Sequence, residues 1–123
     1  MKTHNLINSV LKTLQKETND KIYVGKLKGD SMKNAGLDNG DLLIVDTTMA
    51  FYDGCLAVCE IDQQEMVKRI RIENENIVLI AENPNYENIT IQKSEVALIN
   101  GVVTHAIKDF SRPSENDKII KLE

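Results

Sequence analysis

Apolar residues recur with two different periods along the chain, and the change of period separates a helical start from a body of short strands. Between residues 5 and 16 the apolar side chains share one helical face, namely Leu6, Ile7, Val10, Leu11 and Leu14. A helix of about three turns is marginal in isolation, so we expect it to dock on the rest of the protein.

Beyond residue 20 the apolar residues alternate with polar ones or run on continuously, and turn residues separate the runs. We expect strands at Ile22–Leu27, Leu42–Val45, Cys55–Ile61, Met66–Ile72, Ile77–Ala81 and Ile89–Gln92. Polar turns are predicted at Asp62–Glu65 and Glu73–Asn76. The stretch Val96–Ile107 contains Asn100-Gly101, which is typical of either a hairpin or a bulge.

Short strands with frequent turns predict a mainly β domain, barrel-like or rolled, with one N-terminal amphipathic helix. The 123 residues fit one domain, which we divide into a helical arm at 1–20, a main domain at 21–110 and a polar tail at 111–123. We expect the tail from Pro113 to Glu123 to be loosely held.

Charge and cysteine content exclude several classes of function. The net charge is −4 and the only dense basic run is Lys68-Arg69 with Arg71, so we expect no direct DNA binding. No secretory signal and no apolar run of about 18 residues are present, which predicts neither export nor a membrane span. Cys55 and Cys59 would lie about 13 Å apart along a strand, too far for a disulfide. We expect a reduced, cytoplasmic protein without a metal or cofactor.

Ser31 and Lys68 are the candidate catalytic pair. Ser31 lies in the tight turn Gly29–Met32. Alternation along Met66–Ile72 places Lys68 on the apolar face, while the opposite face carries Val67, Arg69 and Arg71. Burial disfavours the ammonium form and lowers the pKa of a lysine, and a neutral amine is a competent general base.

A serine and a lysine together form a known variant of the catalytic triad, in which the lysine takes the proton of the serine hydroxyl. The backbone amides of Asp30 and Ser31 could form the oxyanion hole on such a turn. His4 and His105 are not placed to replace the lysine. The alternatives are that Ser31 is an ordinary turn residue and that Lys68 extends its amine to the surface.

The sequence around both residues resembles the LexA/UmuD group, the S24-type self-cleaving serine–lysine peptidases of the bacterial SOS response. The nucleophile segment is similar at Gly29–Met32, Ala35–Leu37 and Gly40–Asp46. Val67-Lys68-Arg69 resembles the lysine strand of the group, 37 residues after Ser31. Two later segments are also similar, Asn83–Tyr86 and Gly101–His105, the second to UmuD in particular.

The resemblance implies a LexA/UmuD-type peptidase domain in which Ser31 attacks a peptide bond, Lys68 activates it and the amides of Asp30 and Ser31 hold the oxyanion. It also implies a homodimer formed partly through Val96–Ile107. Self-cleavage in the group is stimulated by RecA filaments on single-stranded DNA, and processed UmuD joins UmuC in a translesion polymerase. We therefore expect an UmuD-like accessory subunit of an error-prone polymerase that carries a peptidase site.

One departure concerns the substrate. The group cuts itself at an Ala-Gly or Cys-Gly bond ahead of the catalytic domain, and residues 1–30 contain neither alanine nor cysteine. Ala35-Gly36 lies inside the nucleophile loop and is a poor candidate. The chain thus most resembles processed UmuD. The alternatives are the catalytic and dimerisation domain of a LexA-like repressor, and a non-catalytic dimerisation module of the same fold.

Overall fold

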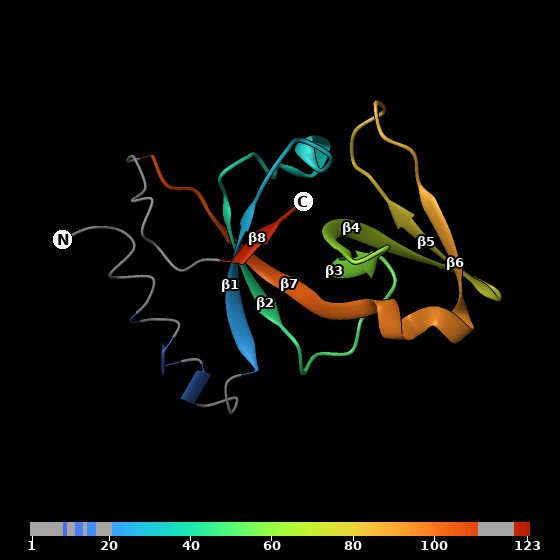
Figure 1. Ribbon diagram of the computed structural model, residues 1–123, viewed down its shortest axis with the longest axis horizontal. Helices are drawn as coiled ribbons and strands as arrows, with labels where there is room; N and C mark the ends of the chain where they lie inside the picture. Colours follow the sequence, from blue (N-terminus) through green and yellow to red (C-terminus); the bar gives the residue numbers. More distant parts are fainter. Residues whose placement is uncertain (1–8, 10–11, 14, 17–20, 111–119) are drawn as a thin grey trace.

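The fold is mainly β, as predicted, and consists of one sheet of eight strands. The computed structural model describes residues 9, 12–13, 15–16, 21–110 and 120–123 (Figure 1). The strands are β1 (Ile22–Leu27), β2 (Leu42–Asp46), β3 (Leu56–Ile61), β4 (Gln64–Glu73), β5 (Asn76–Ile80), β6 (Ile89–Gln92), β7 (Ile99–Ile107) and β8 (Ile120–Leu122). Two 3-10 helices, η1 (Lys33–Ala35) and η2 (Lys93–Leu98), connect them.

The predicted helix at residues 5–16 falls mostly outside the described residues. Those of its positions that the structure describes have helical backbone, namely Ser9, Lys12, Thr13, Gln15 and Lys16. The Gln15 side chain donates a hydrogen bond to the Ile22 carbonyl at 2.9 Å, so this segment contacts the start of β1.

The strand order is β6-β5-β4-β3-β7-β2-β1-β8, and all neighbours are antiparallel except β1 and β8. The parallel pair matters for the site. Just beyond β8, the Glu123 amide donates to the Glu65 carbonyl, and the Val67 amide donates to the Glu123 carbonyl. These bonds link the end of β8 to β4, so the strands from β4 through β3, β7, β2 and β1 to β8 form a closed ring.

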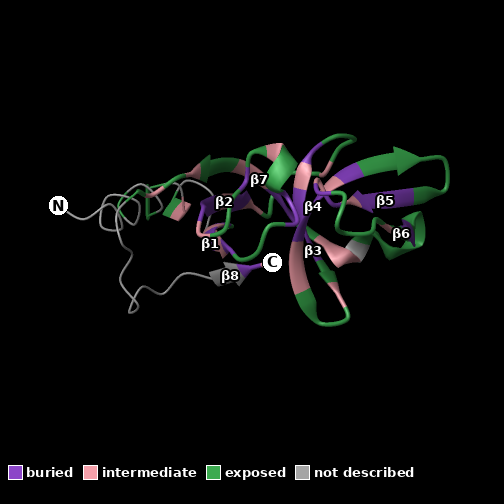
Figure 2. Cartoon of the chain, turned by 90° about the horizontal axis from the view of Figure 1, so that it is seen from above, coloured by how far each residue is buried: buried purple, intermediate pink, exposed green. Residues whose placement is uncertain are grey.

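Two large apolar clusters fill most of the interior, and β4 contributes to both, while a smaller third cluster consists of Val24 and Leu42. One cluster consists of Leu27, Met32, Leu37, Leu43, Val45, Val58, Val67 and Leu122. The other consists of Cys55, Ala57, Cys59, Ile70, Ile77, Leu79, Ile91 and Val102. Val67 is fully buried although it shares a strand face with Arg69 and Arg71, because the rolled sheet covers both faces of β4 at this point (Figure 2).

The structure decides between the two interpretations of Asn100-Gly101. Val58 pairs with Gly101 and Cys59 pairs with Ile99, so Asn100 is an extra residue on β7. This is a β-bulge, and the alternative of a hairpin is wrong. Gly101 is required at the bulge, because a Cβ atom there would lie 2.7 Å from Cγ1 of Val45. The start of the predicted stretch is also not strand, since η2 extends to Leu98.

Two further predictions need correction. The turn predicted at Asp62–Glu65 contains only Asp62 and Gln63, whose φ angles of 51° and 66° build a tight two-residue hairpin, and β4 begins at Gln64. The tail is not loosely held at its far end, because residues 120–122 form β8 and Leu122 is fully buried. The burial of a single leucine in the apolar cluster outweighs the polar character of the segment. Residues 111–119 lie outside the described residues.

Candidate active site

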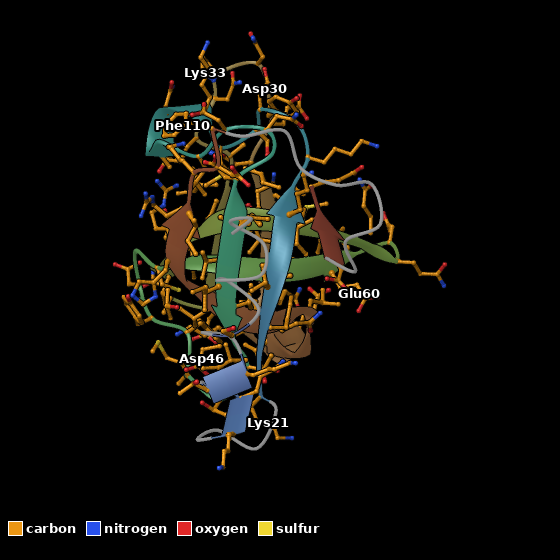
Figure 3. All side chains as sticks on the ribbon, turned by 90° about the vertical axis from the view of Figure 1, so that its left-hand side faces the viewer. Lys21, Asp30, Lys33, Asp46, Glu60 and Phe110 are labelled. Carbon is orange, nitrogen blue, oxygen red and sulfur yellow. The ribbon has the colours of Figure 1, made fainter. Side chains whose placement is uncertain are left out.

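Ser31 lies in a rigid turn that follows β1. Gly29 adopts a φ of 93°, which favours glycine, and its amide donates to Oδ1 of Asn39 at 2.8 Å. The Met32 side chain is fully buried in the first apolar cluster, and this packing attaches the turn to the interior of the domain. The turn thus holds Ser31 in place with 8% of its surface exposed. Figure 3 shows the neighbouring Asp30 at the opposite end of the molecule from Lys21.

Lys68 lies inside β4, opposite Ala57 of β3, and only 6% of its surface is exposed. Its Nζ donates a hydrogen bond to Oγ of Ser31 across 3.2 Å. The structure therefore brings the two predicted residues together, and the alternative of a lysine extended to the surface does not hold. Within the described ranges Lys68 forms no ion pair.

The electrostatic surroundings favour the neutral form of this amine. Desolvation by burial lowers the pKa of Lys68 below its ordinary value, and a thiolate at Cys59 would oppose that shift. The Cys59 thiol is itself fully buried, however, and burial raises its pKa to about 12. Cys59 is thus uncharged at neutral pH, and the desolvation of Lys68 is left without a compensating negative charge.

A second loop holds the nucleophile turn from the side. The buried Asn83 side chain donates from Nδ2 to the Asp30 carbonyl at 2.9 Å, and the Tyr86 hydroxyl donates to Oδ1 of Asp30 at 2.6 Å. The Asn34 amide donates to the Glu82 carbonyl at 2.8 Å. The sequence assigned no role to Asn83 or Tyr86, although their segment was one of those that resembled the family.

The same contacts orient the candidate oxyanion donors. The Asp30 carbonyl belongs to the peptide unit whose N–H is that of Ser31, and it accepts hydrogen bonds from Asn83 and from the Lys33 amide. Fixing the carbonyl fixes the direction of the N–H at the other side of the planar unit. Among the described residues, no acceptor takes the amides of Asp30 or Ser31. Both amides are thus candidates for binding an oxyanion, and their role as an oxyanion hole stays a prediction.

The pair opens into a cleft of about 390 Å³. Its lining consists of Lys28, Gly29, Asp30, Ser31, Gln64, Met66, Lys68, Tyr86, Glu87, Ile89 and Glu123. The cleft combines an apolar wall from Met66 and Ile89 with polar groups near Ser31, the composition expected of a ligand-binding site.

The other reactive side chains lie elsewhere. His105 is exposed on β7, with its Nδ1 2.9 Å from the Thr104 hydroxyl, and His4 lies outside the described residues. Cys55 and Cys59 are buried and unbridged, as the strand spacing predicted. Over the described ranges, no group of three or more His, Cys, Asp or Glu residues could hold a metal ion, and no helix is long and apolar enough to cross a membrane.

The mainly β fold is that of a serine peptidase domain, and comparison with known families agrees. Residues 4–104 match the model of the family described as Peptidase S24-like. The chain therefore belongs to the Peptidase S24-like family.

Similar curated proteins are LexA repressors. The chain is 37% identical to the LexA repressor of Paracidovorax citrulli over 87 residues, which cover 71% of this chain and 39% of that protein. It is 33% identical to the LexA repressor of Oleidesulfovibrio alaskensis over 99 residues, or 80% of this chain and 48% of that protein. The chain thus spans less than half the length of these relatives.

Proposed function

We propose that this chain is the peptidase domain of a LexA-like repressor, and that Ser31 and Lys68 cleave a peptide bond in a self-processing reaction. The observation that carries the proposal is the 3.2 Å hydrogen bond between Lys68 Nζ and Ser31 Oγ, made inside the protein by a lysine whose pKa is lowered by burial. The similarity to LexA repressors supports the choice of role.

The chemistry follows from the geometry. Neutral Lys68 accepts the Ser31 hydroxyl proton while Oγ attacks the carbonyl carbon of the substrate. The amides of Asp30 and Ser31 stabilise the oxyanion of the tetrahedral intermediate. The Lys68 ammonium then gives its proton to the leaving amine nitrogen, and an acyl-serine ester remains. Water, deprotonated by Lys68, attacks the ester and releases the carboxylate product and Ser31.

Ala35-Gly36 is not the bond that is cut. Ala35 ends η1, and Gly36 caps it with a φ of 82° and an amide that donates to the Lys33 carbonyl. This bond is folded into the turn that positions Ser31, whereas a peptidase requires an accessible, extended segment. We place the cleaved bond outside residues 21–110, in an arm of the same protein or in a second copy.

The predicted UmuD-like role rests on the resemblance at Gly101–His105 and on the absence of an Ala-Gly or Cys-Gly bond from residues 1–30. The matches to LexA repressors favour the repressor role instead, so we do not propose a polymerase partner. Within the proposal we retain a homodimer through η2 and β7, where Val96 is 40% exposed, and stimulation of cleavage by RecA filaments on single-stranded DNA.

The proposal is tested with a fluorophosphonate probe, which forms a covalent bond with activated serines, and with a peptide of a LexA-type arm that contains an Ala-Gly bond. Mass spectrometry is expected to locate the probe on Ser31, and Ser31→Ala and Lys68→Ala each to reduce labelling and cleavage by about 1,000-fold or more. Ser94→Ala is the matched control, since this exposed serine of η2 does not line the cleft. Unchanged cleavage in Ser31→Ala would refute the assignment.

A further inference from the structure

Residues 120–123 run between β1, which leads into the Ser31 turn, and β4, which carries Lys68. On one side β8 is parallel to β1, with Leu27 opposite Leu122, and the Lys28 amide donates to the Leu122 carbonyl at 2.6 Å. On the other side Glu123 exchanges two backbone hydrogen bonds with Glu65 and Val67 of β4. Figure 1 shows β8 beside β1, with the chain end directed toward β4.

The register of this segment shows that its end lies close to the catalytic pair. The two hydrogen bonds bracket Met66, so Glu123 lies opposite Met66 in a parallel arrangement. Lys68 is two positions further along β4, and Ser31 is three positions beyond Lys28. A peptide that followed the path of residues 120–123 and continued in the same direction would therefore pass beside the hydrogen-bonded pair of Ser31 and Lys68.

The segment occupies the groups that such a peptide would use. An extended peptide binds a sheet edge through backbone donors and acceptors and through pockets for alternate side chains. Next to the site, the backbone groups that could bind such a peptide are the Lys28 amide, the Glu65 carbonyl and the Val67 amide. Residues 122–123 form hydrogen bonds with all three. The Leu122 side chain fills an apolar pocket in the first cluster and is fully buried.

Side-chain contacts hold the end of the segment in the cleft. The Glu123 carboxylate lies 3.7 Å from Nζ of Lys28 and accepts a hydrogen bond from the Gln64 side chain. Lys28, Gln64 and Glu123 all line the same cleft as Ser31. The segment thus covers the approach to Ser31 from one side without contacting the reacting atoms.

We propose that residues 120–123 are an internal occupant of the peptide-binding groove and must leave it before a substrate can bind. This inference rests on the proposed peptidase function and adds how the site is regulated and how its substrate binds. The substrate is an extended peptide that enters as a strand between β1 and β4. It places a leucine-sized apolar side chain in the Leu122 pocket, and its cleaved bond lies at the level of Lys68, beyond the position of Glu123.

A reversible staple tests whether the segment must leave. Lys28 and Glu123 directly follow the paired residues Leu27 and Leu122 of two neighbouring strands, and such strands lie about 4.8 Å apart, within the range for a disulfide. In Lys28→Cys/Glu123→Cys, the oxidised protein is expected to cleave the arm peptide at least tenfold more slowly than the same protein after dithiothreitol. Equal rates in the two redox states would overturn the inference.

Probe labelling separates access from chemistry. The fluorophosphonate is small and does not need the groove, so it is expected to label Ser31 equally in the oxidised and reduced protein. Loss of labelling on oxidation would count against the inference, because the staple would then act on the catalytic pair. If neither state is labelled and neither cleaves, the peptidase function fails, and the inference is judged on binding alone.

Binding is measured by fluorescence anisotropy with a labelled peptide of residues 117–123, Asp-Lys-Ile-Ile-Lys-Leu-Glu. Leu122→Ala weakens the internal strand, so this variant is expected to bind the peptide at least tenfold more tightly than the unsubstituted chain, and the oxidised staple to bind none. Leu79→Ala is the control, since Leu79 is equally buried but belongs to the second cluster. Equal binding by Leu122→Ala and Leu79→Ala, or binding by the oxidised staple, would overturn the inference.

Discussion

Asn83 donates a hydrogen bond from Nδ2 to the Asp30 carbonyl at 2.9 Å, across 53 positions of sequence. Asn83 is 7% exposed, so this contact is shielded from water. The bond fixes the peptide unit that presents the Ser31 amide, and it does so from a loop that carries none of the reacting groups. The alignment of the nucleophile turn therefore depends on the loop after β5 as well as on the turn itself.

Asn83→Ala is expected to lower the rate of Ser31 labelling by about 10-fold to 100-fold, because the oxyanion donors lose their orientation. It should also reduce the free energy of unfolding by about 1–3 kcal/mol, since the Asp30 carbonyl loses a buried partner. The pH at half-maximal rate should not move, because Lys68 is untouched. Tyr86→Phe removes only the bond to the Asp30 side chain and serves as the milder comparison. An unchanged rate in Asn83→Ala would contradict the positioning role.

The rate of probe labelling is expected to rise with pH. Burial lowers the pKa of Lys68, and only the neutral amine can accept the Ser31 proton. The rate should therefore increase with pH and reach half its maximum below 10.5, the ordinary pKa of lysine. The profile is measured between about pH 6 and 10. A flat profile across this range would exclude a neutral Lys68 as the base.

Lys68→Met is expected to abolish labelling but to stabilise the fold at neutral pH, by on the order of 1 kcal/mol. The native pKa of Lys68 is lower than its unfolded value, so the unfolded state binds more protons between the two pKa values. In the unsubstituted chain, stability therefore rises with pH through this window, and the advantage of Lys68→Met shrinks as the pH approaches 10.5. Urea denaturation at several pH values measures the difference. A constant advantage would contradict the shifted pKa.

Gly101→Ala is expected to reduce the free energy of unfolding by about 1–3 kcal/mol, because the new Cβ would overlap the buried Val45. Gly101→Ala/Val45→Ala creates room at the same place. The double variant should lose less free energy of unfolding than Gly101→Ala and Val45→Ala lose in sum, which a double-mutant cycle measured by urea denaturation will show. Gly54→Ala, with a φ of 89° and open space around its Cβ, tests backbone strain without a clash. Additive losses for the pair would mean that the bulge does not pack against Val45.

The two cysteines are expected to resist thiol reagents in the folded protein. Cys55 and Cys59 are 3% and 0% exposed, and burial raises the pKa of both thiols, that of Cys59 to about 12. Reaction with a chromogenic disulfide reagent at pH 8 should require unfolding and should then yield two thiols per chain. Rapid reaction of either thiol without denaturant would place it outside the core.

The sequence alone determined most of the strands and the mainly β class, and it singled out Ser31 and Lys68 as the candidate pair. Strand periodicity located most elements to within a residue or two, because alternation reports directly on which side chains face the interior. Lys68 could be singled out because a charged residue at an apolar position is a local anomaly. Ser31 could be singled out because its turn is made of local turn residues and resembles that of a known family.

Tertiary structure decided what depends on contacts between distant segments. The pattern could not show that Val67 is buried, because a second covering layer comes from Leu122 and Met32, far away in sequence. It could not choose a bulge at Asn100, since that choice is made by pairing with β3. The sequence could not assign Asn83 a positioning role, because that role depends on its contact with Asp30, far away in sequence. The sequence also could not place residues 120–123 in the sheet. Their backbone partners lie on β1 and β4, and backbone hydrogen bonding leaves no signal in the pattern of side chains.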